Sequence, residues 1–292
     1  MQINDFVIFQ AVAEYNSFTK AATITNTVQS NVTARIKYLE EQFNARLFNR
    51  TSRQIELTEA GLQLLKATKE IQVILDHARK SIGGKLTAVK GLIKIGCIHT
   101  TAALRAPGIL KKFTEEYPQI EFRLKTGTSA SLIKDVISYK LDGAFVAGNV
   151  NHHDLIVQEI LSEELCIVTS TGITSINQLK KSVKPLRMIA FSDGCSYRKL
   201  FEDLLNEWPT KKFTILEQDT LEGIINTVEA GIGITLLPIA LIEKYYSYRN
   251  LNTISLPKKF AQMKTVYVKR KDAPMSESYL LFYKMIEEGY KL

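Results

Sequence analysis

The stretch VQSNVTARIKYLEEQF, residues 28–43, decides the fold of the N-terminal region. Its apolar residues recur at spacings of four, four, three and four, so they share one face of a helix. These residues are Val28, Val32, Ile36, Leu39 and Phe43. We expect this stripe to pack in a core. The opposite face begins with short polar side chains, which allow a close approach to another surface.

A shorter helical stretch, SFTKAAT from Ser17, precedes this helix and is joined to it through Asn26 and Thr27. Ser17 is a suitable N-cap because its hydroxyl can accept a hydrogen bond from a backbone N–H of the first turn. Residues 3–15 predict one more helix, with Phe6, Phe9 and Ala13 on one side. Two helices joined by a tight turn are typical of a helix-turn-helix, whose second helix enters the major groove of DNA.

The segment ARLFNRTSRQIELTEAG, residues 45–61, predicts a β-hairpin wing. Strand candidates at 47–48 and 55–57 flank a polar, basic tip at 49–54. Arg50 and Arg53 would place guanidinium groups at phosphates or in the minor groove, where the negative potential favours Arg. Two basic residues alone usually mark a solvated turn, and a helix with surface Ser and Thr is usually only solvated. The order and spacing of the three elements therefore carry the prediction.

The whole stretch resembles the winged helix-turn-helix of LysR-type transcriptional regulators, and the run QSNVTARIK resembles the CzcR-like branch. Thr25 departs from the family's usual Leu, so we expect Ile24 to pack in its place. Ala34 stands where many members carry Arg or Lys, which removes one contact to DNA. The residues that match the family pattern are Phe9, Ser17, Phe18, Ala21, Ala22, Gln29, Val32, Ile36, Leu39, Glu40, Leu47, Phe48, Arg50, Leu57, Thr58 and Gly61.

The resemblance implies roles for the exposed residues of the second helix. Gln29, Ser30 and Thr33 would meet base edges, since Gln can pair with adenine and Thr can touch a thymine methyl. Arg50 would anchor the DNA backbone and Arg53 would enter the minor groove. The predicted DNA-binding residues are Gln29, Ser30, Thr33, Arg35, Lys37, Arg50 and Arg53.

Charge and composition agree with a nucleic-acid partner without requiring one. The chain has a net charge of +8, and residues 1–90 hold 12 Lys and Arg against 8 Asp and Glu. The three cysteines, Cys97, Cys166 and Cys195, lack the spacing of a disulfide framework and favour a reducing compartment. We find no secretory signal and no apolar run that could span a membrane. The expected location is the cytoplasm.

From Thr58 the sequence predicts a long helix that ends at Gly83 and Gly84, followed by a hinge to residue 90. Its 25 residues would reach about 37 Å, long for a helix inside one small domain. A seam repeats along it, which fits a partner helix in a dimer; packing on the chain's own C-terminal domain is the alternative. The seam residues are Leu65, Thr68, Ile71, Leu75, Ala78 and Ile82.

Beyond residue 91, apolar strands alternate with helices, which predicts an α/β domain with parallel sheets. Strand candidates are 92–98, 120–127, 143–148, 165–170, 187–192 and 265–270, with helices at 106–117, 129–140, 196–208 and 221–231. The region resembles the family's two-lobed effector domain, shaped like a periplasmic binding protein. The resemblance implies a winged helix-turn-helix at 1–58, a dimerisation linker at 59–90 and an effector domain at 91–292. Lobe one would be 91–162 plus 266–292, and lobe two 163–265.

Ligands of such sheets sit at the carboxyl ends of strands, near helix N-termini. The qualifying loops are 99–101, 126–129, 148–149, 192–197 and 219–220. Their hydroxyl and backbone N–H groups suit a small anion or a carboxylate, although each hydroxyl alone could be a plain N-cap. The predicted effector-binding residues are Thr100, Thr101, Thr128, Gly148, Ser192, Cys195, Asp219 and Thr220.

Other chemistry is weakly represented in the sequence. Cys195 lies at a loop-to-helix transition near Arg198, which would lower a thiol pKa and make it a redox sensor, or else it is a packed loop cysteine. His152, His153 and Asp154 resemble a metal clip, but we expect adjacent residues not to share a face and assign no metal and no cofactor. Gly231 and Gly233 are interpreted as the turn between a helix and a strand. We find no pattern of a hydrolase, metalloprotease or nucleotide-binding enzyme.

The sequence thus predicts a non-enzymatic DNA-binding regulator, a dimer or tetramer, that binds an interrupted inverted repeat and responds to a small-molecule effector. RNA polymerase is a further candidate partner. A solute-binding transport protein would explain residues 91–292 but not the first 90. An architectural DNA-binding protein would explain the first 90 but not the pocketed α/β region.

Overall fold

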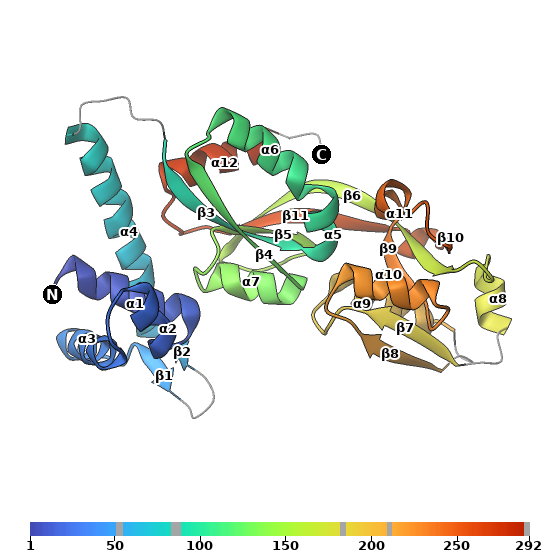
Figure 1. Ribbon diagram of the computed structural model, residues 1–292, viewed down its shortest axis with the longest axis horizontal. Helices are drawn as coiled ribbons and strands as arrows, with labels where there is room; N and C mark the ends of the chain where they lie inside the picture. Colours follow the sequence, from blue (N-terminus) through green and yellow to red (C-terminus); the bar gives the residue numbers. More distant parts are fainter. Residues whose placement is uncertain (51–54, 83–88, 182–184, 209–211, 289–292) are drawn as a thin grey trace. The chain divides into compact units, whose positions relative to one another are not determined.

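We describe the protein from a computed structural model, which covers residues 1–50, 55–82, 89–181, 185–208 and 212–288 (Figure 1). The chain divides into two compact units. The first holds residues 1–89 with two short segments, 138–140 and 272–277, and the second holds the rest. Each unit is described by itself below.

The first unit contains the predicted winged helix-turn-helix. Its helices are α1 (Ile3–Tyr15), α2 (Phe18–Ile24) and α3 (Gln29–Gln42). The wing is the antiparallel hairpin of β1 (Phe48–Arg50) and β2 (Ile55–Leu57), and α4 (Glu59–Ile82) follows it. The tip of the wing, residues 51–54, and the predicted helix end and hinge at 83–88 lie outside the described residues.

The tight turn between α2 and α3 depends on local residue chemistry. Ser17 caps α2 by accepting a hydrogen bond from Lys20 N at 3.2 Å, as predicted. Asn26 holds the left-handed conformation with φ of 51°, which Asn tolerates better than most residues. Glu40 accepts a hydrogen bond from the backbone N–H of Leu47 at 2.9 Å, which ties α3 to the start of the wing.

The predicted apolar stripe of α3 is correct in its centre and wrong at its ends. Val32, Ile36 and Leu39 are fully buried, whereas Val28 is 64% exposed and Phe43 is 44% exposed. Val28 precedes α3 as its N-cap and Phe43 follows it as its C-cap, so both lie outside the helix that carries the stripe. The expectation that Ile24 replaces the family's Leu in packing is also wrong.

Ile24 is the last residue of α2 and is 57% exposed. Thr25 instead turns its hydroxyl back to Ala21 O at 2.8 Å, which satisfies one of the helix's final carbonyl groups. Both Ile24 and Val28 therefore present apolar side chains at the surface of the helix-turn-helix.

The first half of α4 belongs to the core of its own unit, which corrects the predicted partner seam. Leu65 is 4% exposed and Thr68 is 2% exposed, and Gln10 donates a hydrogen bond to the Thr68 hydroxyl at 3.0 Å. Further along α4, Ile71 and Leu75 are half-buried and Ile74 is 66% exposed. Only this later part remains for a partner helix.

The second unit is an α/β domain with two lobes, and the predicted strands appear at or close to their expected positions. The first lobe has β3 (Gly91–Ile98), β4 (Ile120–Gly127) and β5 (Gly143–Ala147), with β6 (Leu155–Ser170) and β11 (Gln262–Arg270) running through the domain. The second has β7 (Leu186–Ala190), β8 (Phe213–Glu217), β9 (Thr235–Pro238) and β10 (Leu251–Ser255). Among the described residues, the larger sheet has the order β10-β6-β11-β5-β3-β4, and β9 also pairs with β6.

The sheets are mixed, so the expectation of parallel sheets is only partly correct. Strand β3 pairs in parallel with β4 and β5, and β7 pairs in parallel with β8. Strand β11 pairs antiparallel with β5 and β6, and β9 and β10 pair antiparallel with β6. The antiparallel pairs arise because the chain enters the second lobe along β6 and returns along β11.

Helices cover both lobes and bring their N-termini to the ends of the strands (Figure 1). The four predicted helices are α6 (Ala106–Glu116), α7 (Ser129–Ile137), α9 (Ser196–Asn206) and α10 (Leu221–Glu229). Gly231, with φ of 71°, lies in the turn between α10 and β9, as predicted. The remaining helical elements are α5 (His99–Leu104), α8 (Ile176–Lys181), α11 (Ile239–Tyr245), η1 (Lys258–Phe260) and α12 (Glu277–Glu287).

Gly61 permits the close approach of α4 to the chain that enters the wing. A Cβ atom at Gly61 would lie 2.2 Å from the backbone oxygen of Leu47, so α4 would have to move away. We expect Gly61→Ala to lower the free energy needed to open helices α1 to α4 by about 2 kcal/mol, as in other overpacked cores. Amide hydrogens of these helices should then exchange roughly 30-fold faster. Hydrogen exchange followed by mass spectrometry measures the exchange rates of the first unit separately from those of the second.

Gly108→Ala is the matched control, because a Cβ on this α6 residue meets no atom within 4 Å. Alanine also has a higher helix propensity than glycine, so exchange in α6 should stay equal or become slower. Equal protection of the first unit in Gly61→Ala and the wild type would contradict the packing argument.

Candidate functional site

The exposed face of α3 carries the short polar residues predicted to meet DNA bases. Gln29 and Ser30 are exposed, and Thr33 is half-buried. Thr33 donates a hydrogen bond to Gln29 O at 3.0 Å, and the Thr19 hydroxyl of α2 donates to Gln29 Oε1 at 3.3 Å. The start of α3 therefore presents hydrogen-bonding groups held by its own helix and by the preceding one.

The two basic residues predicted on α3 differ in their surroundings. Arg35 Nη1 lies 3.3 Å from Asp5 Oδ1, and the Asp5 carboxylate is almost fully buried. The other Asp5 oxygen accepts a hydrogen bond from Gln2 N at 2.8 Å, so this carboxylate joins the start of α1 to α3. Lys37 is mostly exposed and lies 3.7 Å from Glu41, a weak pairing that leaves its ammonium group mobile. The side chain of Arg50 and all of Arg53 lie outside the described residues.

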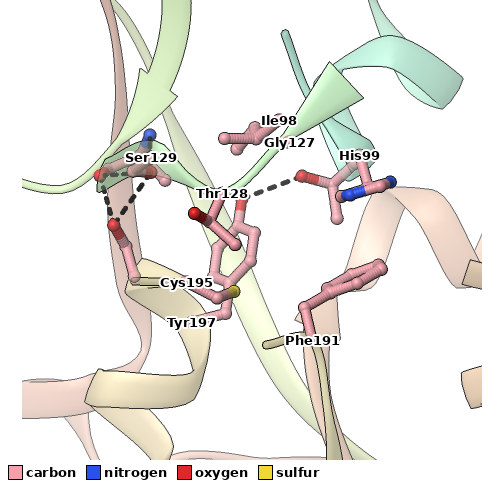
Figure 2. Close-up of a pocket in the computed structure, with 11 residues that line it drawn as sticks. Ile98, His99, Gly127, Thr128, Ser129, Phe191, Cys195 and Tyr197 are labelled. Atoms are coloured by element: carbon pink, nitrogen blue, oxygen red, sulfur yellow. Dashed lines mark hydrogen bonds between the residues drawn. The ribbon is translucent and has the colours of Figure 1, made fainter. Parts of the chain in front are cut away.

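A pocket in the second unit lies where strand ends and helix N-termini of the two lobes meet (Figure 2). Its free volume is about 10 Å³, room for about one water molecule. The described residues around it offer hydroxyl, imidazole and thiol groups but no Lys, Arg, Asp or Glu. Its lining residues are Ile98, His99, Thr100, Gly127, Thr128, Ser129, Ala147, Phe191, Cys195, Ser196 and Tyr197.

Hydroxyl groups connect the two sides of this pocket directly (Figure 2). Ser196, the first residue of α9, donates to Ala147 O at 2.6 Å and lies 3.0 Å from the Ser129 hydroxyl. Ser129 in turn bonds the backbone of Ala147, where β5 ends. Deeper in the pocket, the Thr100 hydroxyl lies 3.3 Å from the Tyr197 hydroxyl, and both side chains are buried.

His99 and Phe191 close one side of the pocket by stacking. Their ring centroids are 4.2 Å apart and their planes differ by 11°. Burial lowers the pKa of His99, while the negative charge of Asp219 acts in the opposite direction. The lowered pKa favours the neutral imidazole, which stacks on an apolar ring without a buried charge.

The structure brings together only some of the predicted effector-binding residues. Thr100, Thr128 and Cys195 line the pocket, and Gly148 lines a larger cavity that adjoins it through Ser129, Ala147, Cys195 and Ser196. The others do not line either cavity: Thr101 is buried in α5, Ser192 and Asp219 are exposed, and Thr220 is the N-cap of α10. Phe191 was missed because an apolar residue at the end of a strand cannot be distinguished from core by sequence.

Two family models together match almost the whole chain. The helix-turn-helix model of bacterial regulatory proteins of the lysR family matches residues 3–62, and the LysR substrate binding domain matches residues 87–291. The chain belongs to the LysR family of transcriptional regulators. It is a DNA-binding regulator with an effector-binding domain, as the sequence predicted.

Known LysR-type proteins resemble the chain over its whole length. The HTH-type regulator YusT of Bacillus subtilis is 36% identical over 97% of this chain and 94% of its own. The regulator CzcR of Bacillus cereus is 34% identical over 100% of this chain and 99% of its own. The crystal structure of full-length CbnR complexed with its target DNA has the same fold, with a TM-score of 0.58, 16% identity, and coverage of 99% and 100%.

The reactivity predicted for Cys195 is opposed by its surroundings. Burial raises the pKa of this thiol, and this effect exceeds the opposite effects of the backbone N–H groups of α9 and of Arg198. Arg198 itself is engaged by Glu202 at 2.9 Å and by Glu217 at 2.6 Å, so its charge is already paired. The other cysteines, Cys97 and Cys166, are free and buried, with pKa values raised to about 12.

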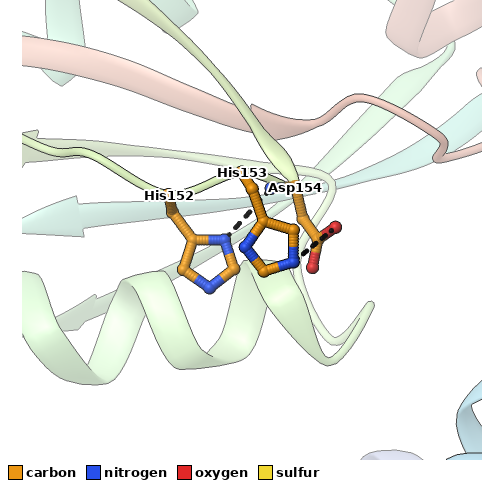
Figure 3. Close-up of side chains that lie close together, drawn as sticks. All are labelled: His152, His153 and Asp154. Atoms are coloured by element: carbon orange, nitrogen blue, oxygen red, sulfur yellow. Dashed lines mark hydrogen bonds and ion pairs between the residues drawn. The ribbon is translucent and has the colours of Figure 1, made fainter.

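His152, His153 and Asp154 lie closer together than we expected of adjacent residues (Figure 3). The imidazole rings stack with centroids 4.7 Å apart, because the segment is a loop rather than a helix. However, His152 Nδ1 accepts a hydrogen bond from Asp154 N at 3.2 Å, and Asp154 Oδ2 lies 3.8 Å from Arg270 Nη1. Since a neutral imidazole has a single nitrogen lone pair, this bond competes with metal coordination. We assign no metal site to this cluster.

The described helices include none that is long and apolar enough to cross a membrane.

The lowered pKa of His99 predicts a pH dependence of stability in this LysR-type domain. Its neutral form is favoured in the folded state, so the stabilisation is complete above the unfolded value of about 6.5 and is lost as the pH falls through the folded value. Between about pH 7.5 and about pH 5.5, we expect the melting temperature of His99→Asn to fall by less than that of the wild type. Differential scanning calorimetry measures both.

His153→Asn is the matched control, because the His153 side chain is 85% exposed. An exposed ion pair such as His153 with Asp154 contributes little to stability, so this variant should lose about as much melting temperature on acidification as the wild type. An equally large loss in His99→Asn would show that His99 does not contribute to the pH dependence.

Proposed function

We propose that this LysR-type regulator binds an interrupted inverted repeat in promoter DNA as a homodimer or a dimer of dimers. The observation that carries the proposal is the composition of α3, whose inner residues Val32, Ile36 and Leu39 are buried while Gln29 and Ser30 face outward. Short hydrogen-bonding side chains at the start of a recognition helix can reach base edges in the major groove. The solved complex of the similar protein CbnR with its target DNA supports the same use of this fold.

The exposed part of α4 supports self-association. Ile74 is 66% exposed, and Ile71 and Leu75 are only half-buried, so this segment would bury apolar surface by pairing with a second copy. A dimer doubles the number of recognition helices and explains why an inverted repeat would be the target. A regulator of this kind acts in the cytoplasm, and RNA polymerase is its candidate protein partner at the promoter.

The pocket between the lobes, together with the adjoining cavity of about 900 Å³, is the proposed effector site. Its hydroxyl groups, with the N-termini of α7 and α9 close by, suit a small polar ligand with acceptor oxygens, such as a carboxylate. Such a ligand regulates DNA binding only if it binds one arrangement of the protein more tightly than another.

The effector is identified by thermal unfolding of the full-length protein against small acids, aromatic acids, amino acids and oxidants. A ligand at 100 times its dissociation constant should stabilise the protein by about 2.7 kcal/mol. Thr100→Val removes one pocket hydroxyl and should reduce that stabilisation by about 1 kcal/mol, the usual contribution of one hydrogen bond.

Thr253→Val, on an exposed position of β10, is the matched control and should keep the full stabilisation. If DNA binding is sequence-selective but no compound stabilises the protein, the effector part of the proposal loses its support. A sequence-specific regulator without control by the tested ligands would then remain, whereas DNA binding without sequence selectivity would favour an architectural DNA-binding protein. Stabilisation by oxidants alone, abolished in Cys195→Ser, would instead favour a redox sensor.

The two kinds of DNA contact are separated by a pair of variants in α3. Gln29→Ala should relax the preference at particular base pairs and leave the salt dependence of binding unchanged. Lys37→Gln should weaken binding to all sequences similarly and reduce the salt slope by about one unit. Fluorescence anisotropy with a selected operator and its single-base variants, at several salt concentrations, measures both quantities. A uniform loss of affinity across all sequences in Gln29→Ala would contradict its base-reading role.

A further inference from the structure

Val28 occupies a position where its side chain does little for the fold. It is the N-cap of α3, with an extended backbone and no side-chain cap hydrogen bond. Its side chain is 64% exposed, whereas Val32, one turn later on the same helix, is fully buried. The stripe of α3 therefore does not include Val28, and core packing does not explain a valine here.

Helix capping does not explain it either. Ser, Thr, Asp and Asn are preferred at N-caps because their side chains accept a hydrogen bond from the first turn, and an aliphatic residue gives up this stabilisation. The Val28 backbone oxygen accepts hydrogen bonds from Asn31 N at 3.1 Å and Val32 N at 3.2 Å, a role that any residue could fill. The sequence thus keeps an exposed apolar group where a polar one would stabilise the helix.

The neighbours of Val28 indicate what this group could contact. Gln29 and Ser30 follow it directly and are exposed, and these residues form the proposed base-reading end of α3. A β-branched side chain has few rotamers, so Val28 presents its two methyl groups in a nearly fixed direction. In the major groove, the apolar group that distinguishes one base from the others is the C5-methyl of thymine.

We propose that Val28 is a specificity-determining residue that reads a thymine methyl group in each half-site. This inference rests on the proposed use of α3 as the recognition helix. It adds an apolar contact to the hydrogen bonds of Gln29 and Ser30. A target half-site would then contain one thymine whose methyl group, rather than its hydrogen-bonding edge, is required.

Replacing single thymines by deoxyuridine tests the proposal, because this removes the methyl group and leaves base pairing intact. An operator is first selected from random DNA with the full-length protein, and each thymine is then replaced in turn. One replacement per half-site should weaken wild-type binding about fourfold, the effect expected for losing one buried methyl contact. In Val28→Ala the same replacement should change affinity less than about 1.5-fold.

Val7→Ala is the matched control, since Val7 is a 46% exposed residue of α1 outside α3. It should retain the fourfold effect of deoxyuridine. Val28→Ser gives a second readout, because a serine can cap α3: its melting temperature should equal or exceed that of the wild type while the deoxyuridine effect disappears. A purely structural residue would not separate these two measurements.

The outcomes distinguish this inference from the function on which it rests. If the wild type selects no operator at all, sequence-specific binding by this chain is wrong. If it selects an operator but every deoxyuridine replacement has the same effect in the wild type and in Val28→Ala, the role of Val28 is overturned and the DNA-binding proposal stands.

Discussion

The antiparallel pairing of β6 with β11 is the constraint on which the ligand-binding unit depends. Strand β6 is 16 residues long, and its first part pairs with β11 while its last part pairs with β9 and β10. A single strand thus contributes to the sheets of both lobes. The register of the pair shifts between Thr265 and Val266, which marks a local irregularity where two strands bend most easily. The two lobes are therefore joined by one continuous strand pair.

Prediction from the sequence succeeded for elements whose apolar residues follow one period and pack against one surface. The centre of the α3 stripe, the wing and the parallel strands of the first lobe all have this property. The stripe failed at Val28 and Phe43 because periodicity indicates which face is apolar but not where the facing helices end. Residues 155–164 of β6 were missed since their partly exposed, charge-rich pattern lacks the apolar run of a buried strand.

The candidate pocket was predicted as a set of loops, and only part of it as residues. The rule that ligands lie at the carboxyl ends of strands identified Thr100, Thr128 and Cys195, which line the candidate pocket. It also selected Asp219 and Thr220 at the end of β8, but both are exposed and lie outside the lining. The pKa of the Cys195 thiol depends on two opposite effects. The sequence showed Arg198, which lowers this pKa, but not the burial, which raises it by more.

The hydroxyl contacts across the pocket have a consequence for how a ligand would be selected. Ser129, Ser196 and the Ala147 carbonyl already bond one another, so a ligand that enters between them exchanges hydrogen bonds rather than adding them. Such an exchange yields little net affinity, but a ligand that lacks a matching oxygen or N–H leaves a desolvated hydroxyl or carbonyl without a partner. Affinity in this pocket would then come chiefly from apolar contact beside Phe191 and Ile98. Discrimination between similar ligands would come from the serines.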